Sequence, residues 1–439
     1  ELPAASVDVR RVGHVLPALR RATRLRAGGG AELRAWRRAQ TEMLQRTLPI
    51  RSWPCVPREG GAGCAQSFGT GAWPTFDDVF WAHFSERFRD PTWYLGLVYI
   101  PIPWHLVVEN YVYKNSTSVP RGMAVQLLES LDHSEFQYFT VMTQACAYQL
   151  PDNKINWTNV LIFDSRGADC FQTVPHRIPI PLLRTSAVSH ATREERDRDV
   201  FFAGSCHFSM SRSRLGPGKD LPPEHAHAAA RYNWIIRRCS NHTDDLLPFE
   251  EYLQHLYNST WAVAASGCYP PSFGLYEIVQ SGALPIIIAS SIGDDKAYKQ
   301  SRGAPTWCSP PMVSEDLSDP FVWLPYRDLG IRWNDFGVVT AMSELQELKA
   351  FIESMSDEEV KRRYALLRKY QPLFTPSGLI VYIEFMLSEA LRSPSLADLT
   401  ARTKAYGRAV DASNLHCEGH GREGRPVDSF QSKGRDRVA

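Results

Sequence analysis

Short apolar runs alternate with helix-length segments through most of the chain, and this alternation limits the fold more than any other feature. The runs "WYLGLVYI", "FQYFTVM" and "TNVLIFD" are rich in Val, Ile, Phe and Tyr, as strands are. The segment "RGMAVQLLESL" lies between two of them. The segment "PTFDDVFWAHFSERF" precedes them and repeats apolar residues every three or four positions, as an amphipathic helix does. Alternating strands and helices predict parallel sheets flanked by helices.

The same rhythm begins again after a charged break, "SHATREERDRD", at residues 189–199. Three strands are predicted there, in "VFFAG", "WAVAAS" and "ALPIIIAS", and helices in "HAHAAARYNWIIRRC" and "PSFGLYEIVQSG". Two more helices are expected at about 343–354 and 357–370. A length of 439 residues accommodates two such units, so we predict an α/β protein with two Rossmann-like domains.

The changes in composition divide the chain into five parts. We expect a basic stalk or linker, partly disordered, at 1–71; a first α/β domain at 72–190; a second at 191–372; a helix that crosses back over the first domain at 373–392; and a disordered tail at 393–439. The Arg-rich first part could contact acidic lipid or an acidic partner, but a stalk or solvated helix is the preferred interpretation.

Composition also excludes several classes of function. The formal net charge is +1, which provides no field that would favour nucleic acid. The nine cysteines include no C-x-x-C pair, so zinc-ribbon and thioredoxin-like sites are not expected. No run of 18 apolar residues occurs, so none of the given sequence is expected to span a membrane.

Four N-x-S/T tripeptides occur, at Asn115, Asn156, Asn241 and Asn258. This number exceeds chance slightly and favours the Golgi lumen or another secretory compartment. Accidental tripeptides in a reduced protein are the alternative. The chain starts at Glu1 rather than Met, so we expect membrane attachment, if present, to come from a preceding anchor, as in a type II membrane protein.

The stretch "WAVAASGCYPPSFGLYEIVQSGALPIII" carries the most chemical information. A strand ends at Ser266, and a helix begins near Ser272, where Pro271 has the φ angle of a helix start. Free N–H groups and the helix dipole attract phosphate to such an end when it lies at the carboxyl edge of a parallel sheet. Glu277, farther along the helix, could hold a ribose diol with its two oxygens. The alternative is that Glu277 is a solvated helix residue.

An ordered set of motifs resembles the exostosin family of glycosyltransferases. The set extends over about 170 residues and comprises Phe202, Gly204, Arg212 and Leu215; Pro271, Ser272, Leu275 and Glu277; Gly282, Pro285 and Ile286 to Ile288; and Leu324, Pro325, Trp333 and Phe336. The resemblance implies a GT-B fold, in which two facing Rossmann-like domains bind the acceptor in the first and the donor in the second. It further implies transfer of a sugar from a nucleotide sugar, commonly a uridine diphosphate (UDP) sugar, to a glycan or glycoprotein.

The chain departs from the family pattern at two places. Gly274 and Ser266 stand where the family has arginines near the diphosphate. Gln144 and Ala145 stand where it has a His-Asp pair. These departures leave the donor and the catalytic base open, and they favour an alternative function, a non-catalytic nucleotide- or glycan-binding protein on the same fold. An enzyme of cytosolic or viral origin with another acceptor is a third hypothesis.

Other side chains complete the predicted site. Gly204 ends a strand in the donor-binding motif, and Arg212 and Arg214, just beyond it, could neutralise a leaving diphosphate, although surface arginines are the alternative. Asp164 and His105 follow strand ends in the first domain and are candidate catalytic bases, while a turn or cap role competes for Asp164.

No metal or cofactor is expected. The D-x-D formed by Asp197 and Asp199 precedes a strand in a charged linker, so we interpret it as solvated. The tail sequence "HCEGH" at 416–420 has ligand-like spacing but too few neighbours to form a zinc site. The sequence therefore predicts metal-independent transfer.

Overall fold

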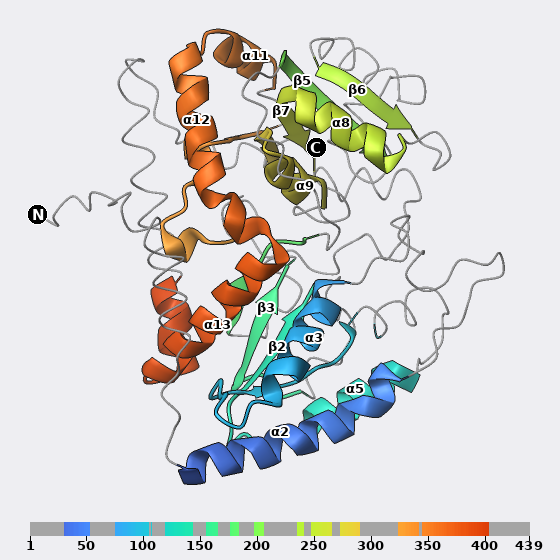
Figure 1. Ribbon diagram of the computed structural model, residues 1–439, viewed down its shortest axis with the longest axis vertical. Coiled ribbons are helices and arrows are strands. Elements are labelled where there is room, and N and C mark those ends of the chain that lie inside the picture. Colours follow the sequence, from blue (N-terminus) through green and yellow to red (C-terminus); the bar gives the residue numbers. More distant parts are fainter. Residues whose placement is uncertain are drawn as a thin grey trace, which may run out of the picture.

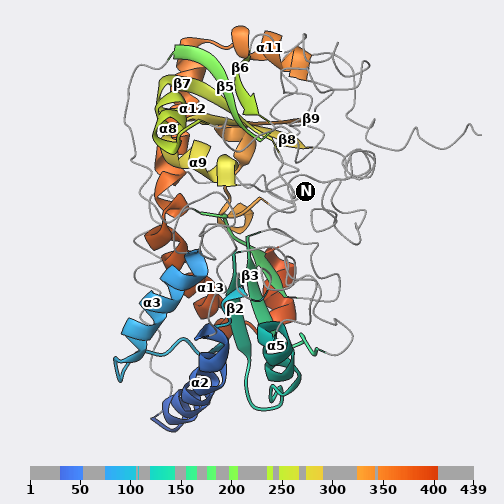
Figure 2. The ribbon, with the colours of Figure 1, turned by 90° about the vertical axis from the view of Figure 1, so that its right-hand side faces the viewer.

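The protein is a mixed α/β fold with two parallel sheets flanked by helices, one sheet in each half of the molecule (Figure 1, Figure 2). This confirms the predicted fold class at that level. The computed structural model describes residues 30–52, 75–104, 107, 119–143, 155–165, 176–183, 197–205, 235–240, 247–265, 273–289, 324–341 and 345–403.

The first sheet has the strand order β1-β2-β3-β4. Its strands are β1 (Val98–Tyr99), β2 (Tyr138–Met142), β3 (Val160–Asp164) and β4 (Arg177–Pro179), and all neighbours are parallel. Every residue of β2 and β3 is buried, which explains why these runs are continuously apolar rather than alternating. Helix α3 (Phe76–Phe88) covers one face, where Phe80 meets the rings of Tyr99 and Phe139.

Helix α2 (Gly30–Arg51) corrects the prediction of a stalk for this part of the chain. The helix packs against β1 and against α5 (Val119–Glu129), and Trp36 donates from Nε1 to the Leu97 carbonyl at 3.0 Å. The Gln40 side chain pairs with both backbone groups of Tyr99, at 2.9 and 2.7 Å. The buried stripe is Trp36, Gln40, Met43, Thr47 and Ile50. Two of its members are polar, so the apolar period was hidden in the sequence.

The second sheet has the order β6-β5-β7-β8-β9, again with all neighbours parallel. The strands are β5 (Asp197–Ser205), β6 (Ile235–Ser240), β7 (Ser259–Ala264), β8 (Leu284–Ala289) and β9 (Val338–Ala341). Helices α8 (Phe249–Asn258) and α9 (Phe273–Ser281) contact each other and the sheet (Figure 1).

Two sequence-based expectations for this sheet were wrong. The end of the helix expected at 225–239 is strand β6, because parallel pairing with β5 outweighs the local helix preference. The D-x-D segment is not a linker, since β5 already begins at Asp197 and pairs there with Ser259. That position is the amino end of the strand, opposite the edge at which parallel sheets bind ligands.

The chain then returns to the first sheet. Helices α11 (Leu345–Glu353) and α12 (Asp357–Tyr370) lead through the 3₁₀ turn η9 (Gln371–Phe374) into α13 (Pro376–Arg392), which reaches α3 (Figure 1). On α13, Glu384 pairs with His83 of α3 at 2.9 Å. Tyr382 donates to Asp328, in the 3₁₀ turn η6 (Arg327–Leu329), at 2.9 Å. Through these two contacts, α13 connects the two halves.

Residues 393–403 also differ from the expected tail. Residues 396–403 are helical, and Leu396 and Leu399 are buried. The Thr400 hydroxyl lies 3.4 Å from Nδ1 of His176, beside β4. The described end of the chain is therefore part of the first half's core.

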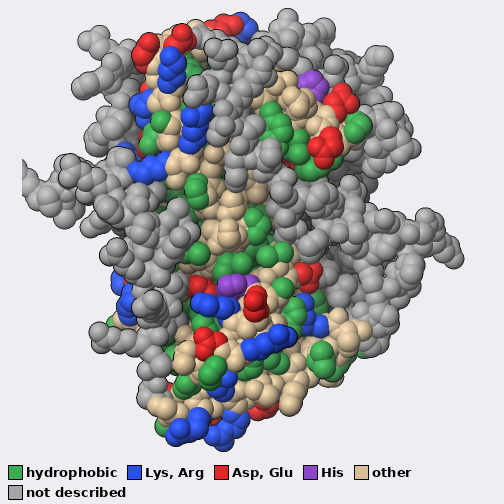
Figure 3. Space-filling view, in the orientation of Figure 1, with side chains coloured by type: hydrophobic (Ala, Val, Ile, Leu, Met, Phe, Trp, Pro, Cys, Tyr) green, Lys and Arg blue, Asp and Glu red, His purple; other side chains and the backbone are tan. Residues whose placement is uncertain are grey.

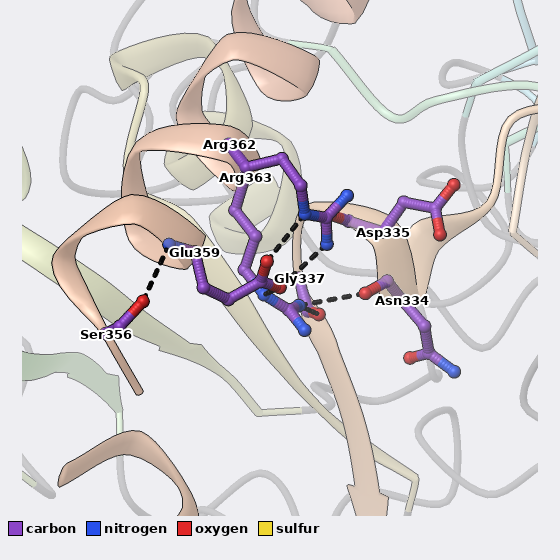
Figure 4. A network of polar contacts seen from close by, with 7 residues as sticks. All are labelled: Asn334, Asp335, Gly337, Ser356, Glu359, Arg362 and Arg363. Atoms are coloured by element: carbon purple, nitrogen blue, oxygen red, sulfur yellow. Dashed lines mark hydrogen bonds and ion pairs between the residues drawn. The ribbon is translucent and has the colours of Figure 1, made fainter. Parts of the chain in front are cut away.

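A polar network fixes the segment before β9 (Figure 4). The Arg363 guanidinium, on α12, donates to the carbonyls of Asn334 and Gly337 at 2.9 and 2.7 Å and pairs with Glu359 at 2.9 Å. Hydrogen bonding from Arg362 lowers the pKa of Glu359, so the carboxylate stays charged. The network holds Trp333, in the turn η7 (Trp333–Asp335), inside the core, which makes this residue of the resemblance a packing residue.

Candidate functional site

The strand order of the second sheet points to a ligand-binding edge. Along the chain, β5 is followed by β6 on one side, and β7 to β9 then follow on the other, so the order reverses between β5 and β7. In open parallel sheets, ligands bind beyond the carboxyl ends of the strands at such a reversal. Here that point lies beside Ser205 and Ala264.

Gly204 takes a backbone conformation at this point that other residues rarely adopt. Its φ is 151°, and it is the penultimate residue of β5. A glycine there leaves the backbone free to turn and lets a ligand approach closely. The predicted donor-binding glycine therefore lies at the reversal point of the sheet.

Helix α9 follows β7 and carries the predicted carboxylate. Glu277 is only 3% exposed, so the alternative of a solvated helix residue is wrong. Its neighbours Leu275, Tyr276 and Ile278 are buried as well, which shows that the helix is enclosed around its circumference. A buried carboxylate loses several kcal/mol of hydration unless polar groups replace the water.

The carboxyl end of α9 is held firmly. Gly282, at φ 81°, donates to the Val279 carbonyl at 3.1 Å and Ala283 to that of Ile278 at 3.1 Å, which is a Schellman ending. The Gln371 side chain donates to the Val279 and Gln280 carbonyls, at 3.0 and 3.2 Å. These bonds fix the direction of the helix axis and hence of its amino end.

Two glutamines of this clamp were not predicted. Gln280, on α9 and 3% exposed, donates from Nε2 to the Phe374 carbonyl of η9 at 2.8 Å. In the other direction, Gln371 of η9 donates to the Val279 carbonyl of α9. The signal in the sequence was weak: a glutamine directly before a proline at the end of α12, in "RKYQPLF". Neither residue contacts the predicted ligand position; both position α9.

Five of the predicted site residues lie outside the described residues. They are His105, Arg212, Arg214, Pro271 and Ser272. Of the predicted set, the structure therefore places Gly204 and Glu277 in the second half and Asp164 in the first.

Asp164 ends β3 and is 1% exposed. Its Cα pairs with Met142 on one side and Pro179 on the other, and its carbonyl accepts from Ile180 at 2.9 Å. The residue thus lies at the carboxyl edge of the first sheet, where a ligand would be expected. Its side chain is enclosed at that edge.

A second buried aspartate occupies the same edge and was not predicted. Asp77, in the first turn of α3, accepts from Oγ1 of Thr143 at 2.5 Å, and both residues are at most 2% exposed. Met142 pairs with Asp164, so Thr143, the next residue, points to the opposite face. The structure therefore separates the two aspartates by the sheet. Asp77 joins the start of α3 to the end of β2.

Asp328, in the turn η6, is the carboxyl group that contacts the connecting helix α13 through Tyr382. The residue is partly accessible, but burial of its carboxyl group raises the pKa to about 6, against the hydrogen bond from Tyr382, which lowers it. Its partner phenol, Tyr382, has a raised pKa for the same main reason, burial.

Two statements about metal ions and membranes can be made for the described residues. No group of three His, Cys, Asp or Glu side chains within them is arranged to hold a metal ion. None of the helices there combines the length and the apolar character that crossing a bilayer requires.

No protein-family model matches the chain, and no curated protein shows significant similarity to it.

Proposed function

We propose that the chain is a glycosyltransferase with a GT-B fold, similar to the exostosin family, that transfers a sugar from a nucleotide sugar to a glycan or glycoprotein. The observation that carries the proposal is the second sheet. Its strand order reverses beside Gly204, and the helix that follows β7 contains the buried Glu277. Together with the motif resemblance, this arrangement suits a nucleoside diphosphate, probed most simply as UDP.

The donor's two polar parts have different partners in this proposal. The diphosphate lies at the amino end of α9, near Pro271 and Ser272, where unpaired N–H groups and the helix dipole attract it. Arg212 and Arg214 neutralise the charge that develops on the leaving diphosphate. Glu277 accepts hydrogen bonds from the ribose hydroxyls.

The acceptor lies at the carboxyl edge of the first sheet. A hydroxyl of the acceptor attacks the anomeric carbon of the donor sugar, the bond to the diphosphate breaks, and the nucleoside diphosphate leaves with the bonding electrons. Where the reaction inverts, Asp164 or His105 takes the proton of that hydroxyl. The partial positive charge at the amino end of α9 and the two arginines stabilise the leaving diphosphate in place of a divalent ion. Turnover is therefore expected to continue in the presence of a chelator.

One face of the molecule shows how charge is distributed over the described residues. On the face shown in Figure 3, the basic and acidic side chains of the described residues are interspersed, as the net charge of +1 suggests. Partners of this proposal are a nucleotide sugar and a glycan or glycoprotein, in the Golgi lumen or elsewhere in the secretory pathway.

A non-catalytic nucleotide- or glycan-binding protein is the second candidate. The observation in its favour is the sequence itself, which has Gly274 and Ser266 where the family has arginines, and Gln144 and Ala145 where it has His-Asp.

A donor screen separates the two. The chain is incubated with common UDP-sugars, with and without a mixture of glycan acceptors and with and without chelator, and released UDP and products are measured. Binding of UDP and of the glycan mixture is measured in parallel by calorimetry. Sugar transfer supports the enzyme, binding of UDP or glycan without transfer supports the binder, and the absence of transfer and of both kinds of binding contradicts both.

A further inference from the structure

Two of the four N-x-S/T tripeptides lie in described residues, and their surroundings differ sharply. Asn156 precedes β3, whereas Asn258 is the last residue of α8. The proposed function assigns no role to either. Which of them could accept a glycan depends on whether the asparagine amide and the hydroxyl two residues later are accessible.

Around Asn156, alternate side chains point into and out of the core. Ile155 and Trp157 are 6% and 3% exposed, whereas Asn156 and Thr158 between and after them are exposed. The buried tryptophan therefore anchors the segment and turns both recognition side chains to solvent.

The hydrogen bonds orient the asparagine amide for reaction. The backbone N–H of Thr158 donates to Oδ1 of Asn156 at 3.0 Å. Because a backbone N–H can only donate, the acceptor must be the amide oxygen, and Nδ2, the atom that is glycosylated, points away. Within the described part of the chain, no hydrogen bond holds that nitrogen.

Asn258 is in the opposite situation. Ser259 and Thr260, which complete its tripeptide, are 4% and 3% exposed in β7, between β5 and β8. The Oδ1 atom of Asn258 lies 3.5 Å from Nε2 of Gln254, one helical turn earlier. Access to the Thr260 hydroxyl would require removal of a central strand.

We propose that Asn156 is an N-glycosylation site and that Asn258 is not. In the reaction, Nδ2 of Asn156 forms a bond to the anomeric carbon of a lipid-linked oligosaccharide diphosphate, the lipid diphosphate leaves, and the amide loses a proton. The inference rests on passage through the secretory pathway, not on sugar transfer by the protein itself.

The position of Asn156 is compatible with the proposed function. Asn156 precedes the amino end of β3, and Asp164 is at the carboxyl end of the same strand. Five strand residues span roughly 17 Å, at about 3.3 Å per residue. A glycan on Asn156 therefore projects from the edge of the sheet opposite the proposed acceptor site.

The test is glycopeptide mapping of the full chain, expressed behind a secretion signal in eukaryotic cells and released with peptide N-glycosidase in heavy-oxygen water. In most molecules Asn156 is expected to be converted to labelled Asp, whereas Asn258 is expected to stay unconverted in nearly all of them. Thr158→Ala is the matched control, because it removes the recognised hydroxyl but keeps the backbone N–H that orients Asn156. It should abolish the label at Asn156, as Asn156→Gln should.

Three outcomes overturn the inference: unlabelled Asn156 in chain recovered from the secretory membranes, a label at Asn156 that survives Thr158→Ala, or Asn258 labelled as fully as Asn156. The donor screen is run separately on enzymatically deglycosylated protein. Absence of transfer both before and after deglycosylation, with Asn156 labelled, would contradict the proposed function alone.

Discussion

Replacing Glu277 by glutamine tests the α9 carboxylate while nearly preserving its volume. The residue is 3% exposed, so alanine would leave a cavity beside Leu275 and Ile278 and confuse packing with binding. Glutamine fills the same space but offers one acceptor oxygen and an NH₂ group in place of two acceptor oxygens. A ribose diol that donates to both carboxylate oxygens would lose one charge-assisted bond and weaken the other.

The size of the effect follows from the energy of such bonds. A hydrogen bond to a charged group contributes about 1.5–3 kcal/mol, so Kd should rise about 10- to 150-fold. Uridine and UDP share the ribose, so both should weaken by the same factor. Calorimetric titration of each ligand into wild type and variant measures this, and thermal unfolding verifies the fold.

Glu384→Gln is the matched control. Glu384, on α13, is also buried, at 7% exposure, but it pairs with His83 on α3 rather than with any residue of α9. Its substitution should leave both affinities unchanged. Unchanged binding in Glu277→Gln, or equal losses in the two variants, would refute the assignment of Glu277 to the ribose.

Three further predictions concern the glutamine at the end of α9, the turn that contacts α13, and the two aspartates of the first sheet. Gln371→Ala should lower the free energy of unfolding by about 1–3 kcal/mol, since two buried carbonyls at the end of α9 lose their donor; a melting temperature equal to wild type would count against the clamp. Asp328→Asn should stabilise the fold at pH 7 by up to about 3 kcal/mol, because the folded pKa of about 6 lies some two units above the ordinary 3.8. Because of this raised pKa, the wild-type protein gains stability as the pH falls from about 6 to about 4, and the denaturant midpoints of wild type and Asp328→Asn should approach each other over that range. A difference between the two midpoints that stays constant with pH would contradict the raised pKa. Asp164→Asn should lower kcat by about 10²- to 10⁴-fold with UDP affinity unchanged, while Asp77→Asn, across the sheet, should not; the reverse ranking would move the base to Asp77.

The sequence predicted the layers of the fold well because the buried strands are continuous apolar runs. β2, β3, β7 and β8 all coincide with such runs. It failed at α2, whose packed stripe contains Gln40 and Thr47. Gln40 bonds to Tyr99, 59 residues away in β1, whereas the Thr47 hydroxyl bonds to carbonyls of its own helix, so neither position belongs to an apolar period in the sequence. β6 failed for a related reason, since only pairing with β5 makes that segment a strand.

The candidate site was predictable where its residues come from one continuous segment of the chain. The strand, turn and helix that place Glu277 are contiguous, so its position on α9 could be inferred, but its burial depends on the whole surroundings. Asp77 and Gln371 could not be found in this way. Their partners, Thr143 and the Val279 carbonyl, lie 66 and 92 residues away, and nothing local marks such pairs.

Photoaffinity labelling with an azido-uridine diphosphate tests the central claim most directly, because it asks where the nucleotide binds. After irradiation, the labelled peptides are mapped with and without excess unlabelled UDP. The account predicts competed labels at the carboxyl end of β5, around Gly204, and on the segment that enters α9, ahead of Glu277. Competed labels confined to the first sheet, or no label that UDP displaces, would contradict a nucleotide site at the reversal point of the second sheet.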